Sequence, residues 1–179
     1  MEKIKPNELP ITFSTELFFD TNIWLLIYGP FGDFKKNRQK AYTALFESVV
    51  SKNCSIYLSS MVLSEYANVV LRYEFSIWKE KKTKMGADYK RDFVGTETYQ
   101  EKVRSVKEQL NAILNLPNII KLPDNFNAIS LDNVFSDFGA SDFNDAYINE
   151  TVNSKNLILV TDDGDFEAIY KGKKLVTMS

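Results

Sequence analysis

The stretch LILVTDDGDF, residues 157–166, decides the expected fold of this chain. Its first half, LILVT, is a continuous apolar and β-branched run, which is typical of a strand buried on both faces of a parallel sheet. Its second half places Asp162, Asp163 and Asp165 directly after that strand. Because parallel α/β sheets bind ligands beyond the carboxyl ends of their strands, these acids are expected at a binding edge. For this loop alone, a solvated acidic turn around Gly164 is the alternative.

Apolar runs elsewhere predict further strands over 17–20, 55–58, 119–122 and 174–178. Apolar residues spaced by three and four predict helices over 23–28, 37–50, 61 to beyond 72, 96–114 and 140–153, the last capped by Ser141. Residues 76–95 are polar and partly basic, and either a helix or a loop fits them. The alternation predicts an α/β fold with a mostly parallel central sheet flanked by helices and an extended helical segment after the second strand.

The length of 179 residues favours one domain over residues 1–179. No apolar run approaches the roughly 20 residues that span a bilayer. The first residues, MEKIKPNELP, lack the apolar core of a signal peptide. Cys54 is the only cysteine, which excludes an internal disulfide. A cytoplasmic location without membrane contact is therefore expected.

The chain contains no histidine. This excludes Ser-His-Asp and Cys-His hydrolysis, and it argues against structural zinc, which takes several Cys and His ligands. The remaining side chains are rich in oxygen ligands, which suit Mg²⁺ or Mn²⁺. The net charge is −2, so a polyanionic partner has to be held by a local basic patch or by metal.

Four acids that are distant in sequence are expected to meet at one edge of the sheet: Asp20, Glu65, Asp145 and Asp163. Asp20 and Asp163 end or follow strands, while Glu65 and Asp145 lie in the first turns of crossover helices, which begin at the same edge. Two unit charges about 4 Å apart repel by roughly 4 kcal/mol at an effective dielectric near 20. A divalent cation is the simplest reason to keep them together.

Each segment taken alone has an ordinary structural alternative. Glu65 could be a half-buried partner of a lysine or arginine. Asp142 and Asp145 could serve the dipole of their helix. The sequence Asp20-Thr21-Asn22 could be a strand end followed by a helix cap. The functional interpretation depends on all four segments placing acids on one edge.

In order and spacing, four segments resemble the motifs of the PIN-domain nucleases, a group that includes the VapC-type toxins. The segments are FFDTNIWLL, SSMVLSEYANV, SDFNDAYINETV and LILVTDDGDF, within residues 17–166. The resemblance implies a PIN-like domain with catalytic and metal-binding roles for Asp20, Glu65, Asp145 and Asp163. It also implies further metal ligands at Asp165 and Asp142, and supporting roles for Thr21, Asn22 and Thr161. Asp145 fits the motif better than Asp142 because Ala146 and Ile148 follow it.

The implied activity is hydrolysis of RNA phosphodiester bonds with one or two Mg²⁺ or Mn²⁺ ions. Asp20 and Asp163 are the expected direct ligands, and Glu65 and Asp145 are expected to bind through water or to act on the attacking water. A toxin-like nuclease would also have a protein antitoxin and form a homodimer.

A basic cluster interleaved with Tyr73, Trp78 and Tyr89 is the candidate RNA path, because backbone charge and aromatic stacking suit single strands. Its members are Lys79, Lys81, Lys82, Lys84, Lys90 and Arg91. A solvated helix face is the alternative for this cluster.

Two other functions fit parts of the sequence. In a haloacid-dehalogenase-like phosphohydrolase, Asp20 would be a covalent nucleophile, but that family has D-x-D where this chain has Asp20-Thr21-Asn22. A non-catalytic PIN-like binding or scaffold domain would keep the fold without turnover.

Overall fold

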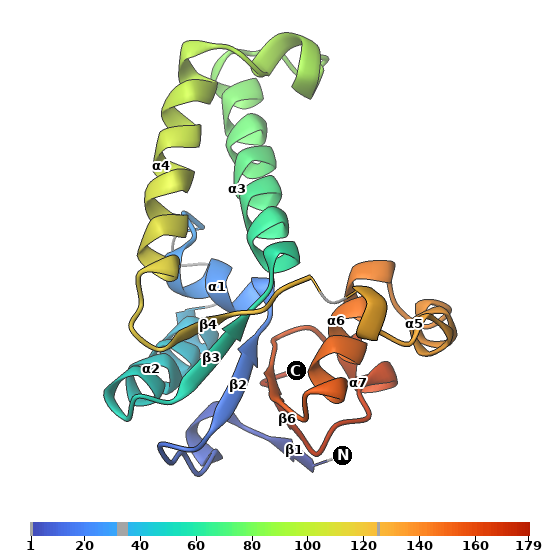
Figure 1. Ribbon diagram of the computed structural model, residues 1–179. Helices are drawn as coiled ribbons and strands as arrows, with labels where there is room; N and C mark the ends of the chain where they lie inside the picture. The colour runs from blue at the N-terminus through green and yellow to red at the C-terminus, as the bar shows by residue number, and fades with distance from the viewer. Residues whose placement is uncertain (1, 32–35, 125) are drawn as a thin grey trace.

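The computed structural model describes residues 2–31, 36–124 and 126–179 (Figure 1). A six-stranded sheet runs through the molecule in the order β1-β6-β5-β2-β3-β4, and every hydrogen-bonded pair of strands is parallel. The strands are β1 (Glu2–Ile4), β2 (Glu16–Phe19), β3 (Ser55–Leu58), β4 (Ile119–Lys121), β5 (Ile158–Val160) and β6 (Lys174–Val176). The expected α/β class with a parallel sheet is confirmed.

Helices connect the strands and cover both faces of the sheet, with α1 and α2 on one side and α6 and α7 on the other (Figure 1). The helices are α1 (Thr21–Tyr28), α2 (Lys36–Ser51), α3 (Ser60–Lys81), α4 (Glu97–Leu114), α5 (Leu131–Phe138), α6 (Phe143–Ser154) and α7 (Phe166–Ile169). Opposite faces follow from right-handed crossovers, because the chain moves one way from β2 to β4 and the other way from β4 through β5 to β6. None of the described helices is long and apolar enough to cross a membrane.

The core is built on β2, where Leu17, Phe18 and Phe19 are fully buried. A run buried on both faces is what a central strand between β5 and β3 requires. The indole of Trp24 packs 5.4 Å from the ring of Phe19, and its Nε1 donates to the Phe19 carbonyl at 3.1 Å. Burying a single leucine or phenylalanine side chain stabilises a fold by about 1.5–3 kcal/mol. This rigid strand fixes the position of the residue that follows it, Asp20.

The long helices α3 and α4 form an antiparallel arm that projects from the sheet (Figure 1). The arm is the expected extended helical segment, and it resolves the open question about residues 76–95. Helix α3 continues to Lys81, and a single π-helical turn, Tyr89–Phe93, follows the loop at the tip. Trp78 and Phe93 are buried there, 5.4 Å apart between ring centroids.

Some features of the fold differ from the expectations. Strand β1 and helices α5 and α7 were not expected. The cap of α6 was also assigned wrongly, because the side chain of Asp142, and not that of Ser141, accepts a hydrogen bond from the backbone N–H of Asp145 at 2.9 Å. A carboxylate is an equally good N-cap acceptor and complements the helix dipole.

Candidate active site

Asp20 lies between the end of β2 and the first turn of α1, with 4% of its surface exposed. One carboxylate oxygen, Oδ1, accepts from the Thr21 backbone N–H at 2.6 Å. The other, Oδ2, accepts from Asn22 Nδ2 and from the Thr161 hydroxyl, each at 2.7 Å. The supporting residues expected from the sequence therefore hold Asp20 in one orientation. Oδ1 keeps a lone pair for another donor or a cation.

Glu65 reaches the same edge from the second turn of α3. The Thr21 hydroxyl donates to Glu65 Oε2 at 2.8 Å. Ser59 begins the helix by accepting from the Val62 N–H with its side chain, at 3.4 Å. Thr21 thus joins two acids that are 45 residues apart, since its side chain binds Glu65 and its backbone binds Asp20.

Asp145 lies in the first turn of α6 and is half-buried. Burial raises its pKa to about 8, and the charges of Asp142, Asp20, Asp163 and Glu65 add to that rise. Asp142 itself is exposed and is engaged as the helix cap. Removal from water is thus the main cost of ionising Asp145, and four nearby carboxylates increase it.

The loop after β5 places Asp163 and Asp165 beside Asp145. One carboxylate oxygen from each of these three residues lies within 4.8 Å of the others. The Thr161 hydroxyl accepts from the Asp163 N–H at 3.0 Å, and Asp163 Oδ1 accepts from the Asp165 N–H at 3.0 Å. These bonds fold the loop into a tight turn that presents its acids to α6. Asp165, expected as an additional ligand, belongs to this closest group.

We call Asp20, Glu65, Asp145, Asp163 and Asp165 the acidic centre. Burial raises the pKa of Asp20 to about 7, an effect opposed by its hydrogen bonds and increased by the charges of Glu65 and Asp163. Within residues 2–31, 36–124 and 126–179, no lysine or arginine forms an ion pair with a member of this centre. Clustered carboxylate oxygens without a basic partner fit a hard divalent cation such as Mg²⁺ or Mn²⁺.

Asp162, next to Asp163, has a different environment that sequence analysis did not anticipate. Its carboxylate is buried and accepts from Arg38 Nη1 at 2.7 Å and from the Tyr42 hydroxyl at 3.1 Å. The carbonyl oxygen of Thr161 lies 3.0 Å from the same Tyr42 hydroxyl, so the two acceptors share its one proton. Helix α2 therefore anchors the loop that carries Asp163. The spacing of Arg38 and Tyr42 by four residues places them on one face of α2, but it does not indicate their partner.

The basic cluster lies at the tip of the arm, away from the acidic centre (Figure 1). A rise of about 1.5 Å per residue places Lys81 roughly 24 Å along α3 from Glu65. Some of the cations have local partners: Lys79 lies over the Phe75 ring, Lys84 over the Trp78 ring, and Arg91 pairs with Asp92. Any contact of this cluster with RNA remains a prediction.

Comparison with known proteins assigns the family. The family model for the PIN domain matches residues 17–172. The chain belongs to the PIN-domain family. PIN domains are generally nucleases, and the expected fold and resemblance are confirmed.

Solved structures also resemble this PIN domain. One is VapBC2 from Rickettsia felis, in a crystal structure with a DNA fragment from the promoter of VapBC2. It is 18% identical, the match covers 91% of this chain and 98% of that one, and the TM-score is 0.49. Another is PAE2754 from Pyrobaculum aerophilum, with 18% identity over 90% of each chain and a TM-score of 0.46. No curated protein sequence matches the chain significantly.

Proposed function

We propose that this PIN domain is a divalent-metal-dependent endoribonuclease. The observation that carries the proposal is the group of three carboxylates within 4.8 Å of one another, Asp145, Asp163 and Asp165, next to a buried Asp20 whose pKa is raised. A cation bound by such acids lowers the pKa of a coordinated water and stabilises negative charge on a phosphate. Without histidine, the chain offers carboxylates to receive the proton of the attacking water.

We assign a separate role to each residue of the acidic centre according to its position. Asp163 and Asp145, with Asp165, would hold the cation, and Asp20 would contribute the free lone pair of its Oδ1. Glu65, oriented by the Thr21 hydroxyl, is placed to orient or deprotonate a water at the edge of the group. Thr161 and Asn22 keep the Asp20 carboxylate fixed, so that little reorganisation is needed when substrate binds.

The environment of Asp20 disfavours the phosphohydrolase alternative. A covalent nucleophile must approach phosphorus directly, whereas only 4% of the Asp20 surface is exposed and three hydrogen bonds fix its carboxylate. A scaffold domain without turnover is tested by calorimetry, since the proposed enzyme binds Mg²⁺ or Mn²⁺ near millimolar concentration or tighter.

The decisive experiment is cleavage of single-stranded RNA with Mn²⁺ by purified protein and three variants. Asp20→Asn and Asp163→Asn are expected to lower cleavage by at least about 100-fold, since changing even an outer-sphere partner typically costs 10–100-fold. Asp132→Asn is the matched control, because it removes one exposed carboxylate on α5 that lies outside the acidic centre. Unchanged cleavage by Asp20→Asn would exclude the proposed site.

The motif order is also the basis for proposing a toxin role, in which a protein antitoxin neutralises the nuclease and the chain forms a homodimer. Co-expression with the product of a neighbouring short open reading frame tests this role. A stable complex with suppressed RNA cleavage is expected, and full activity in the mixture would contradict it.

A further inference from the structure

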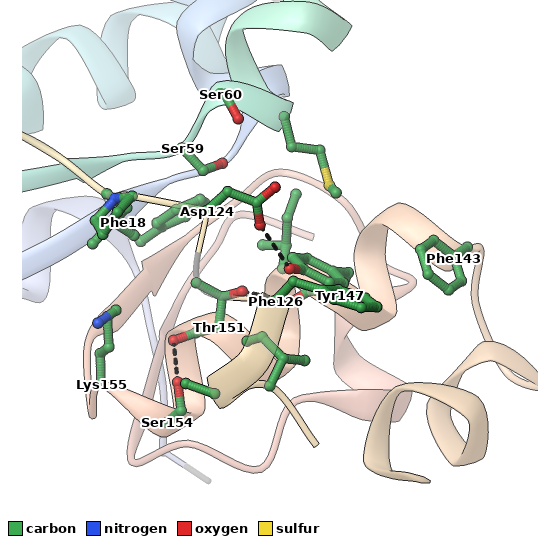
Figure 2. A pocket seen from close by; sticks show the side chains of 16 residues that line it. Phe18, Ser59, Ser60, Asp124, Phe126, Phe143, Tyr147, Thr151, Ser154 and Lys155 are labelled. Carbon is green, nitrogen blue, oxygen red and sulfur yellow. Dashed lines mark hydrogen bonds between the residues drawn. The ribbon is translucent and has the colours of Figure 1, made fainter. Parts of the chain in front are cut away.

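A cavity of about 270 Å³ lies between α6 and the carboxyl ends of β3 and β4 (Figure 2). It shares two helices with the acidic centre. Met61 lines the cavity one turn before Glu65 on α3, and Ile148 lines it one turn after Asp145 on α6. A ligand group in the cavity would therefore be next to any phosphate held by the carboxylates.

The walls of the cavity are mostly apolar, and aromatic rings stand at its rim. Phe143 and Tyr147, one turn apart on α6, have ring centroids 6.1 Å apart and planes inclined by 33°. Phe143 is 38% exposed and Phe126 is 55% exposed, so both rings are reached from solvent. Flat, partly exposed rings around a hollow offer stacking surfaces to a planar ligand.

Two polar side chains meet near the middle of the cavity, Asp124 and Tyr147. The Tyr147 hydroxyl donates to Asp124 Oδ1 at 3.3 Å, as Figure 2 shows. A carboxylate accepts hydrogen bonds only, and Asp124 keeps further lone pairs for amino groups. Ser60 lines the end nearest α3, while Lys155 lines the opposite end (Figure 2). The Ser60 hydroxyl, the Asp124 carboxylate and the Lys155 ammonium group thus follow one another along the cavity. This order suits a nucleotide whose base meets the carboxylate while its backbone meets the groups at the two ends.

We propose that this cavity is a nucleobase subsite, which holds one unpaired base of the RNA strand whose phosphate lies at the acidic centre. The inference rests on the proposed function and specifies its substrate as single-stranded, because a paired base would first have to be unstacked and unpaired, at a cost of a few kcal/mol. Asp124 gives the subsite a preference for bases with an exocyclic amino group, namely adenine, cytosine and guanine, over uracil.

The test measures equilibrium binding of short fluorescent RNA strands without added metal and with Ca²⁺, alongside cleavage with Mn²⁺. Strands of a single base type are compared with strands carrying one abasic nucleotide at each position in turn. Since stacking of one base is worth 1–3 kcal/mol, one abasic position is expected to raise the dissociation constant by about 5- to 150-fold.

Variants assign that effect to the cavity. Thr151→Phe fills it and Tyr147→Ala removes a stacking ring, so both are expected to weaken binding of intact strands and to abolish the abasic effect. Tyr147→Phe keeps the ring and should retain most of the affinity. Asp124→Asn should narrow the difference between uracil and the other bases. Phe135→Ala is the matched control, because this 60% exposed ring on α5 lies outside the cavity wall.

The two proposals fail in different ways. Unchanged dissociation constants and KM for Thr151→Phe and Tyr147→Ala, in variants with native circular dichroism, would overturn the subsite even if the wild type cleaves RNA. Loss of the abasic effect in these variants, in a protein that cleaves no RNA with any metal, would support the subsite and contradict the proposed nuclease.

Discussion

The Thr161 hydroxyl donates a 2.7 Å hydrogen bond to Asp20 Oδ2, across 141 positions of sequence. The same oxygen of Thr161 accepts from the Asp163 N–H at 3.0 Å. One buried side chain therefore fixes the first acid of the centre and orients the loop that carries the last. This arrangement is possible because β2 and β5 are neighbours in the sheet.

Thr161→Val should remove both interactions, together with the 3.0 Å hydrogen bond from Asn22 Nδ2, while keeping the shape of the side chain. We expect the free energy of unfolding to fall by about 1–2 kcal/mol, because a buried carboxylate loses a donor and a backbone N–H loses its acceptor. Urea denaturation measures the loss, and calorimetry with Mn²⁺ should show weaker binding. Thr161→Ser, which restores the hydroxyl, is the control, and equal metal affinities for Val and Ser would contradict the orienting role.

Stability without metal should decrease as the pH rises. The pKa of Asp20 is raised to about 7 and that of Asp145 to about 8, each above the value of 3.8 that an aspartate ordinarily has. The folded state therefore holds more protons than the unfolded state, and it is most stable below the unfolded pKa. Stability is lost as the pH rises from about 4 through the two folded values.

Urea denaturation in a chelator, over a pH series from about 5 to about 9, measures this decline. Asp145→Asn should flatten the upper part of the curve, since the group that titrates there is gone. Added Mn²⁺ should reverse the decline, because deprotonated carboxylates bind metal. A stability that is constant or rising over this range would show that the acids are ionised at little cost.

Arg38→Leu should destabilise the fold through Asp162. The variant removes the Arg38 guanidinium from a buried carboxylate. Because a third of the Arg38 side chain is exposed, the expected cost is below that of a fully buried pair, about 1–3 kcal/mol. Lys3→Leu is the matched control. Both side chains of the Lys3–Glu167 pair are exposed, so its loss should lower the free energy of unfolding by less than about 1 kcal/mol. Arg38→Leu combined with Asp162→Asn should recover part of the loss, which a purely local packing defect would not.

The tip of the arm should contribute to RNA affinity in a salt-dependent way if the basic cluster contacts the backbone. Replacing Lys81, Lys82 and Lys90 with Gln should weaken binding, and each lost phosphate contact should lower the dependence of log K on log salt by about 0.7 for a single strand. Binding at several salt concentrations gives this slope. An unchanged slope would mean that these lysines form only a solvated helix face.

Sequence patterns located the elements that bury a strong apolar pattern. LFF of β2 and LILV before Thr161 are continuous apolar runs, and the acids that follow them were placed at the correct edge. Strand β1 escaped notice because only Ile4 of its three residues is buried. Helix α5 was overlooked although Leu131, Val134, Phe135 and Phe138 have helical spacing and Ser130 caps it.

Contacts between distant side chains could not be predicted in the same way. Nothing local distinguishes Asp162, which faces Arg38 and Tyr42, from Asp163, which faces Asp145, although the two are adjacent. Their directions depend on how the loop turns after β5, and that turn is set by hydrogen bonds to Asn22 and Thr161. The cavity beside α6 likewise exists only after the segments around β4 and α6 have packed.

The buried rings at the tip of the arm, Trp78 and Phe93, pack with Phe75, Tyr89 and Tyr99 rather than with the residues over the sheet. The tip thus has a small apolar interior of its own, separate from the core over the sheet, and such a unit can unfold at a lower free energy than the whole domain. Because α3 and α4 meet mainly each other there, whole turns can be gained or lost in pairs over evolutionary time. A lineage could thereby adjust its reach to new partners while the carboxylates at the base stay where they are.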